Sequence, residues 1–139
     1  MNETEMEDFL REPQLSELGT VLRDGSPHVT PVWHHYEGGH FYILAGPETV
    51  KIKNIQRDPR ICVTVASYAP PYTYVMARGQ ADISQDRKSD LLVDMSVRYM
   101  GVEKGTRYAE SVKDVDFVTI TLKPEHLVVW GDGRPVNRV

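Results

Sequence analysis

The sequence lacks the features that would place the protein outside the cytoplasm. Its single cysteine, Cys62, cannot form a disulfide within the chain. No run of apolar residues approaches the roughly 20 residues of a membrane-spanning helix. The first residues, with Asn2, Glu3 and Glu5 after Met1, do not form the basic and then apolar segment of a secretory leader. We therefore expect a cytoplasmic protein without a membrane span.

Positive charge is not in excess either. The chain has 16 Lys and Arg residues against 20 Asp and Glu residues, which gives a net charge of −4. A general nucleic-acid binder needs a basic face that neutralises phosphates, so we expect no nucleic-acid partner. The composition leaves room for a local basic site.

The length of 139 residues predicts one domain over residues 1–139, because domains usually contain roughly 100–150 residues. A dinucleotide-binding domain followed by a substrate domain is excluded. A chain this short cannot easily enclose a large cofactor and still keep a core. We expect any such site to lie at a homodimer interface.

The five histidines do not have the spacing of a metal site. His34 and His35 are adjacent on a predicted strand and so point to opposite faces, whereas His28 and His34 share a face but lie roughly 20 Å apart. We expect ordinary surface or interface histidines and no metal.

Side chains for nucleophilic catalysis are also missing from the pattern. The chain has no G-x-S-x-G turn, and Cys62 lies in an apolar run that is typical of a core strand. The acidic residues are scattered at helix starts and turns, which is typical of a solvated surface rather than of a general-acid pair. The pattern therefore identifies no catalytic residue.

Hydrophobic periodicity predicts a mainly β protein with flanking helices. A period near 3.6 predicts helices over residues 4–11, 48–57 and 86–100, and a short helix or a loop over 105–113. Alternation and turn residues predict strands over residues 20–23, 27–36, 40–45, 61–66, 73–83 and 115–123, and a short one over 127–130. About six strands with local connections favour a small antiparallel barrel with helices packed outside.

Two features of the strands are unusual. Pro31 lies in the middle of an otherwise regular strand, and proline there predicts an edge or a bulge because it lacks an N–H group. Trp33, Tyr72 and Tyr74 could each contact a planar ligand. Taken singly, aromatic residues in such positions more often belong to an ordinary core.

A basic helix follows the turn at Gly46. Its first turn offers free backbone N–H groups, the Thr49 hydroxyl and the Lys51 ammonium, and Lys53 and Arg57 share another face. This helix is either a phosphate site or an amphipathic helix whose cations face water.

In combination, three segments resemble a known family. They are residues 22–33 (LRDGSPHVTPVW), 46–60 (GPETVKIKNIQRDPR) and 75–81 (VMARGQA). Together they resemble the flavin/deazaflavin oxidoreductases, which are the split β-barrel relatives of pyridoxamine 5′-phosphate oxidase. The resemblance covers roughly residues 18–130 and is closest to the group that uses coenzyme F420.

The resemblance implies a six-stranded antiparallel split β-barrel that forms a homodimer, with the cofactor at the subunit interface. It also implies roles for thirteen residues. The edge of the cofactor ring would lie along Thr30, Pro31, Val32 and Trp33, and beside Leu44 and Ala45. The phosphate would lie at Thr49, Lys51 and Asn54, an anionic tail near Lys53 and Arg57, and Tyr72 and Tyr74 would come from the partner subunit.

Two departures from pyridoxamine 5′-phosphate oxidases bear on the cofactor. Those enzymes carry an arginine at the position of Thr30, which helps to hold the phosphate of FMN. They also have a C-terminal extension that recognises the pyridoxal ring, whereas this sequence finishes at residues 131–139 (GDGRPVNRV). The departures weaken the case for FMN and make oxidation of vitamin B6 unexpected.

The resemblance thus implies an F420-dependent oxidoreductase that transfers a hydride between the deazaflavin and a planar, electron-poor small molecule. The cofactor carries this chemistry, so no side-chain nucleophile is needed. A proton would come from Tyr72, His28 or solvent. Two alternatives remain open: an FMN-dependent reductase or oxidase of the same fold, and a module that binds a cofactor or haem without turnover.

Overall fold

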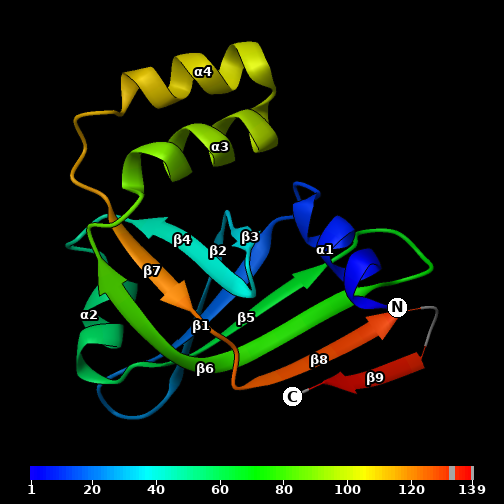
Figure 1. Ribbon diagram of the computed structural model, residues 1–139. Helices are drawn as coiled ribbons and strands as arrows, with labels where there is room; N and C mark the ends of the chain where they lie inside the picture. Colours follow the sequence, from blue (N-terminus) through cyan, green and yellow to red (C-terminus); the bar gives the residue numbers. More distant parts are fainter. Residues whose placement is uncertain (132–133, 139) are drawn as a thin grey trace.

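The computed structural model describes residues 1–131 and the backbone of residues 134–138. Within these residues the chain forms four helices and nine strands (Figure 1). The helices are α1 (Glu3–Arg11), α2 (Val50–Arg57), α3 (Lys88–Met100) and α4 (Val102–Ser111). The strands are β1 (Ser16–Val21), β2 (Pro27–Val32), β3 (His35–Glu37), β4 (His40–Ala45), β5 (Arg60–Ala66), β6 (Tyr74–Ser84), β7 (Val118–Leu122), β8 (His126–Gly131) and β9 (Arg134–Arg138).

The strands form one antiparallel sheet with the order β2-β1-β5-β6-β7-β4-β3, and β8 joins it through β6. β6 is the longest strand. Residues 74–80 of β6 pair with β5, and residues 81–84 pair with β7. The sheet curls along β6 into a half-barrel (Figure 1), which is consistent with the expected split barrel.

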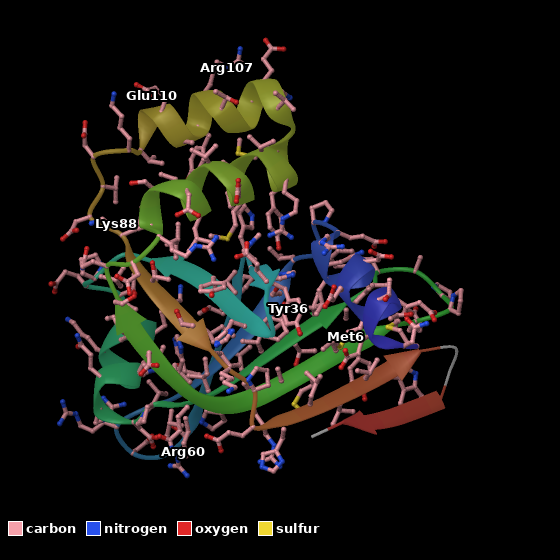
Figure 2. All side chains as sticks on the ribbon, viewed as in Figure 1. Met6, Tyr36, Arg60, Lys88, Arg107 and Glu110 are labelled. Atoms are coloured by element: carbon pink, nitrogen blue, oxygen red, sulfur yellow. The ribbon has the colours of Figure 1, made fainter. Side chains whose placement is uncertain are left out.

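The inner face of the half-barrel holds the core. Every second residue of the central strands points inward, as in β5, where Ile61, Val63 and Val65 are buried. Two helices close the core from outside. α1 contributes Met6 (Figure 2), Phe9 and Leu10, and α2 contributes Ile52 and Ile55.

Local signals place the turn between β1 and β2 and the end of α2. At the turn, Gly25 has a φ of +88°, which favours glycine, and the Asp24 carboxylate accepts from the backbone N–H of Ser26. α2 ends at Arg57, immediately before Asp58 and Pro59, as the sequence predicts. β1 and β2 therefore form a tight antiparallel hairpin.

The prediction of six strands is wrong, because the described residues form nine. The predicted strand over residues 27–36 is two strands, β2 and β3, separated by Trp33 and His34. The first strand begins at Ser16 rather than at residue 20, and β9 was not expected. The segment predicted as a short helix or a loop over 105–113 is a regular helix, α4.

The helices were compared with the length and apolarity that a membrane-spanning helix needs. Among the described residues, none of them is long and apolar enough to cross a bilayer.

Candidate cofactor site

The strand β2 lies at one end of the sheet order formed by the described residues. An edge strand has one row of backbone N–H and C=O groups that the sheet does not use. Pro31 occupies this strand, as expected for a residue without an N–H donor. The free edge of β2 can therefore bind the polar rim of a planar ligand.

A cavity of about 180 Å³ lies next to this strand. Five of the thirteen predicted residues line it, namely Pro31, Val32, Trp33, Leu44 and Lys51. Four residues of the second half of the chain complete the wall, namely Leu92, Met95, Tyr108 and Phe117. The lining is mostly apolar, and its only charged residue is Lys51 at the start of α2. The structure thus brings residues from β2, β4 and α2 together under the α3–α4 hairpin.

Two buried polar atoms on β2 have no hydrogen-bond partner within the described residues. They are Oγ1 of Thr30 and Nδ1 of His28. Both side chains lie on the inner face of β2, because their cross-strand partners Leu18 and Thr20 are buried. Leaving such groups unpaired costs roughly 1–3 kcal/mol each. A ligand that accepts hydrogen bonds, such as a phosphate, fits this strand face.

The helix α2 presents polar side chains toward the β1–β2 hairpin. Asn54 is buried, and its Nδ2 donates to Oγ1 of Thr20 at 3.0 Å. Arg57 donates from Nη2 to the carbonyl of Val21 at 2.6 Å and to Oδ1 of Asn54 at 3.0 Å. These bonds fix α2 against β1. The predicted contact of Asn54 with a phosphate stays a prediction.

Three other predicted residues near α2 and β4 do not line the cavity. Thr49 is the N-cap residue of α2, and its hydroxyl donates to the carbonyl of Gly46 at 2.8 Å. Lys53 is exposed and lies 3.8 Å from a carboxylate oxygen of Glu48. Ala45 points into the core, where it is buried, whereas its neighbour Leu44 lines the cavity.

Trp33 packs on the α3–α4 hairpin. Its indole stacks on the ring of Tyr99, with centroids 4.9 Å apart and planes 6° apart, and meets the ring of Tyr108 edge-on at 5.8 Å. One face of the indole is therefore already covered by protein. Trp33 can border a ligand in the cavity but cannot stack on it with that face.

His34 corrects the expectation of surface or interface histidines, because it is completely buried. Its Nε2 donates to the carbonyl of Leu10 at 2.8 Å, which leaves Nδ1 as an acceptor for the hydroxyl of Ser16. Burial lowers the pKa of His34 to about 4, so the ring is neutral near pH 7. His34 is a core residue.

Two residues of α3 hold the backbone at His34. The guanidinium of Arg98 donates to the carbonyl of His34, and the hydroxyl of Tyr99 accepts from its backbone N–H at 3.1 Å. The Tyr99 hydroxyl itself donates to the carbonyl of Gln14 at 2.7 Å. These contacts explain why the strand breaks after Val32. No local pattern indicates these contacts, because the partners are far apart along the chain.

Tyr72 and Tyr74 do not reach the cavity of their own chain. Leu44 pairs with Thr119, which pairs with Ser84 at the far end of β6. Tyr74 begins β6, so ten residues, or roughly 33 Å of strand, separate it from that ladder. Tyr72 is 58% exposed, and Tyr74 stacks on Trp130 at 5.9 Å.

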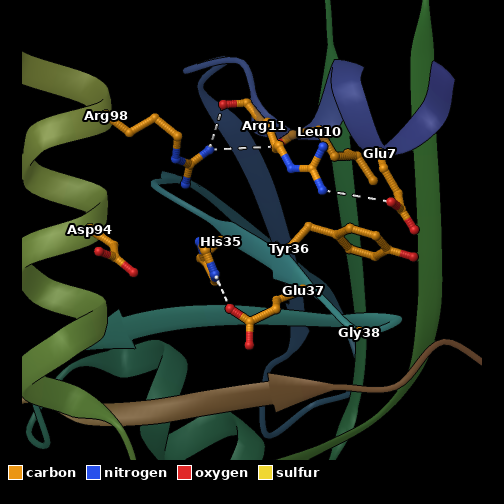
Figure 3. Close-up of a pocket in the computed structure, with 9 residues that line it drawn as sticks. All are labelled: Glu7, Leu10, Arg11, His35, Tyr36, Glu37, Gly38, Asp94 and Arg98. Atoms are coloured by element: carbon orange, nitrogen blue, oxygen red, sulfur yellow. Dashed lines mark hydrogen bonds and ion pairs between the residues drawn. The ribbon is translucent and has the colours of Figure 1, made fainter. Parts of the chain in front are cut away.

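A second pocket, of about 390 Å³, lies between α1, β3 and α3 (Figure 3). None of the thirteen predicted residues lines it. Its basic side chains already have partners within the protein: Arg11 pairs with Glu7, the His35 ring lies 3.1 Å from a carboxylate oxygen of Glu37, and Arg98 donates to the carbonyls of Leu10 and Arg11. Across the described part of the chain, no cluster of three His, Cys, Asp or Glu side chains could hold a metal ion.

The sequence of the chain matches a known family. A family model described as pyridoxamine 5′-phosphate oxidase matches residues 3–131. The chain belongs to the pyridoxamine 5′-phosphate oxidase family. The resemblance carried by the three sequence segments is therefore confirmed. The comparison with curated protein sequences found no match for this chain.

Solved structures share the fold of this member of the pyridoxamine 5′-phosphate oxidase family. Protein Rv2991 from Mycobacterium tuberculosis has a TM-score of 0.77 and 22% identity, over 100% of this chain and 92% of that chain. An F420 reductase has a TM-score of 0.70 and 25% identity, over 87% of this chain and 94% of that chain. A heme binding protein from Mycobacterium smegmatis has a TM-score of 0.70 and 16% identity, over 100% of this chain and 59% of that chain.

Proposed function

We propose that this protein is an oxidoreductase that binds the deazaflavin coenzyme F420 and reduces a planar, electron-poor small molecule. The observation that carries the proposal is the cavity beside the free edge of β2, with Lys51 as its single charged residue. The unpartnered Oγ1 of Thr30, on the strand that borders the cavity, adds a donor for an anion. A cytoplasmic location is part of this proposal.

The residues of the chain would bind and orient the cofactor. Lys51, the N-terminus of α2 and the Thr30 hydroxyl would hold the phosphate. The free backbone edge around Pro31 and Val32 would bond the rim of the ring, and Leu44 would pack against it. When bound in its reduced form, the deazaflavin supplies a hydride, and solvent completes the reduction with a proton.

We also propose that the working form is a homodimer. A cavity of about 180 Å³ is smaller than the roughly 300–1,000 Å³ typical of ligand pockets. Tyr74 at the start of β6, and Tyr72 before it, lie too far from the cavity to complete it within one chain. A second copy, placing these tyrosines against the cavity of the first, would enlarge the pocket and exclude water from the ring.

Two alternatives have specific support. The family model favours FMN, which pyridoxamine 5′-phosphate oxidase uses, but Thr30 stands where an arginine would hold the phosphate of FMN. The structural likeness to a heme binding protein supports a module that binds a tetrapyrrole without turnover.

One experiment separates the three functions. The protein is purified from its own host, its visible absorbance is recorded, and the released ligand is identified by mass spectrometry. Reduced F420 is then supplied with a panel of quinones and nitroaromatics. We expect F420 binding and oxidation of reduced F420 that depends on the acceptor. Stoichiometric flavin would favour the FMN enzyme. Bound haem, or F420 binding without reduction of any acceptor, would favour the binding module.

A further inference from the structure

We propose that a pocket between α3, α4 and the segment before β7 binds the electron acceptor as an uncharged, planar aromatic ring. We name it the hairpin pocket, because the α3–α4 hairpin forms most of its wall. The inference rests on the proposed function, since it gives the second reactant of that reaction a place beside the cofactor cavity.

The hairpin pocket has the size of a small-molecule site. Its volume is about 330 Å³, which lies within the roughly 300–1,000 Å³ typical of ligand pockets. It lies where the α3–α4 hairpin stands above the half-barrel and the chain returns to β7 (Figure 1). α3 contributes Leu92, α4 contributes Ala109, and the segment before β7 contributes Val115 and Phe117. The wall is therefore largely apolar.

The hairpin pocket meets the cofactor cavity at two side chains. Leu92 and Phe117 line both spaces, so a ligand in either one contacts the same apolar pair. The pocket of Figure 3 shares no residue with the cofactor cavity. Reacting atoms have to approach to about 3–3.5 Å, so an acceptor needs a space that adjoins the cofactor. This adjacency assigns the hairpin pocket to the acceptor.

Apolar side chains of the hairpin pocket remain open to water. Val93 on α3 is 48% exposed, and Val115 is 47% exposed. Leu92 and Phe117 are partly exposed as well. A planar ring in the pocket would cover these side chains, and removal of apolar surface from water is the main favourable term in such binding.

The charged side chains around the hairpin pocket favour an uncharged ligand. Lys88 pairs with Asp116 at 3.2 Å, and Lys113 pairs with Glu110 at 2.6 Å. Both lysines of the lining thus already have a carboxylate partner. An anionic ligand would lose its water without gaining a free ammonium group. The remaining carboxylate, Asp114, is exposed, and water weakens its attraction for a cation.

The test uses menadione, an uncharged two-ring quinone, and a naphthoquinone sulfonate, which has the same two rings and a negative charge. Binding is followed in methyl NMR spectra of protein with isotope-labelled valine and leucine, first without cofactor and then with F420. The proteins are the wild type, Val93→Glu and Val102→Glu. Val102 is 74% exposed on α4 and does not line the hairpin pocket, so it serves as the matched control. Thermal unfolding establishes that each variant is folded.

We expect menadione to shift the methyl signals of Val93 and Val115 but not those of Val102. The Leu92 methyl signals should respond both to menadione and to F420. We expect Val93→Glu to weaken menadione binding about tenfold and Val102→Glu to change it less than twofold, while both variants keep the F420 affinity of the wild type. The sulfonate should bind to the wild type at least about tenfold more weakly than menadione.

Turnover with reduced F420 connects this binding to the reaction. We expect Val93→Glu to raise the KM for menadione about tenfold and to change kcat less than twofold. Menadione shifts confined to the cofactor cavity, for example at Val32, or equal menadione affinities of the two variants, would overturn the acceptor pocket. F420 binding by the wild type would then still support the proposed function. Menadione bound in the hairpin pocket of a protein that binds no F420 would overturn the proposed function and, with it, the role of this ligand as acceptor.

Discussion

The indole of Trp33 lies flat on the phenol ring of Tyr99, with the ring centroids 4.9 Å apart. Arg98, the neighbour of Tyr99 on α3, places its guanidinium 4.9 Å from the centre of the same ring. The hydroxyl of Tyr99 also fixes the backbone at His34. Tyr99 thus contributes both to the end of β2 and to the position of Trp33 beside the cavity.

Substitutions at Tyr99 separate these two roles. Tyr99→Phe keeps the stack but leaves the Gln14 carbonyl and the His34 N–H without their partner, so we expect a loss of about 1–3 kcal/mol in the free energy of unfolding. We expect its F420 affinity to stay near that of the wild type. Tyr99→Leu removes the stack as well, and we expect it to weaken F420 binding several-fold. Denaturant titration, Trp fluorescence and ligand titration measure these effects. Equal F420 affinities of the two variants would contradict the role of the stack.

The packing of α4 on α3 depends on Gly105. A Cβ atom at this position would lie 2.3 Å from the backbone oxygen of Ser96. Gly105→Ala gains about 1 kcal/mol of helix propensity, but we expect the clash to outweigh it and to lower the free energy of unfolding by about 2 kcal/mol. Gly19→Ala is the matched control, because its Cβ would meet the nearest atoms at 3.7 Å. Equal stability of Gly105→Ala and the wild type would contradict the close packing.

The buried ring of His34 makes stability depend on pH. Its pKa falls from 6.5 to about 4 on folding, because burial disfavours the charged ring. The unfolded chain therefore binds a proton that the folded protein does not bind between these pH values. We expect the free energy of unfolding to lose nothing to this residue above pH 6.5. As the pH falls to 4, we expect the free energy of unfolding to decrease by about 3 kcal/mol. Denaturant titrations across this range measure the slope. In a folded His34→Gln variant, the free energy of unfolding should depend on pH with a slope that is smaller by about one proton. An unchanged slope would assign the pH dependence to other groups.

Some of the fold could be predicted from local patterns alone. The alternation of β4 and the stop signal of Asp58 and Pro59 after α2 were sufficient because their causes lie within the segments themselves. The break between β2 and β3 could not be predicted, since it depends on Arg98 and Tyr99 from α3. The regular helix α4 also depends on tertiary packing at Gly105.

The candidate site was predictable to a similar extent. The motifs around Pro31 and Lys51 predicted site residues, and the structure brings several of these residues into one cavity. The residues from α3, α4 and the loop before β7 were missed, because nothing in their own spacing relates them to β2. The unpartnered atoms of His28 and Thr30 can be recognised only after the partners of their neighbours are known.

A shared site between two chains can be tested by mixing defective subunits. Lys51→Ala removes the phosphate cation, and Tyr74→Ala removes the ring that we assign to the partner's pocket. We expect each homodimer to bind F420 weakly. In a heterodimer of the two variants, one pocket combines an intact Lys51 with an intact Tyr74. We therefore expect one tight site per heterodimer in titration calorimetry. Weak binding in every pocket would show that both residues act within one chain, or that neither acts across the interface.

The most direct test of the account is a comparison of F420 and FMN affinities by titration calorimetry of the wild type, Lys51→Ala and Lys104→Ala. Lys104 is an exposed lysine on α4 and serves as the charge-matched control. We expect the wild type to bind F420 at least about tenfold more tightly than FMN, Lys51→Ala to weaken F420 binding about tenfold, and Lys104→Ala to match the wild type. Tighter binding of FMN, or an F420 affinity that Lys51→Ala leaves unchanged, would contradict a deazaflavin site between β2 and α2.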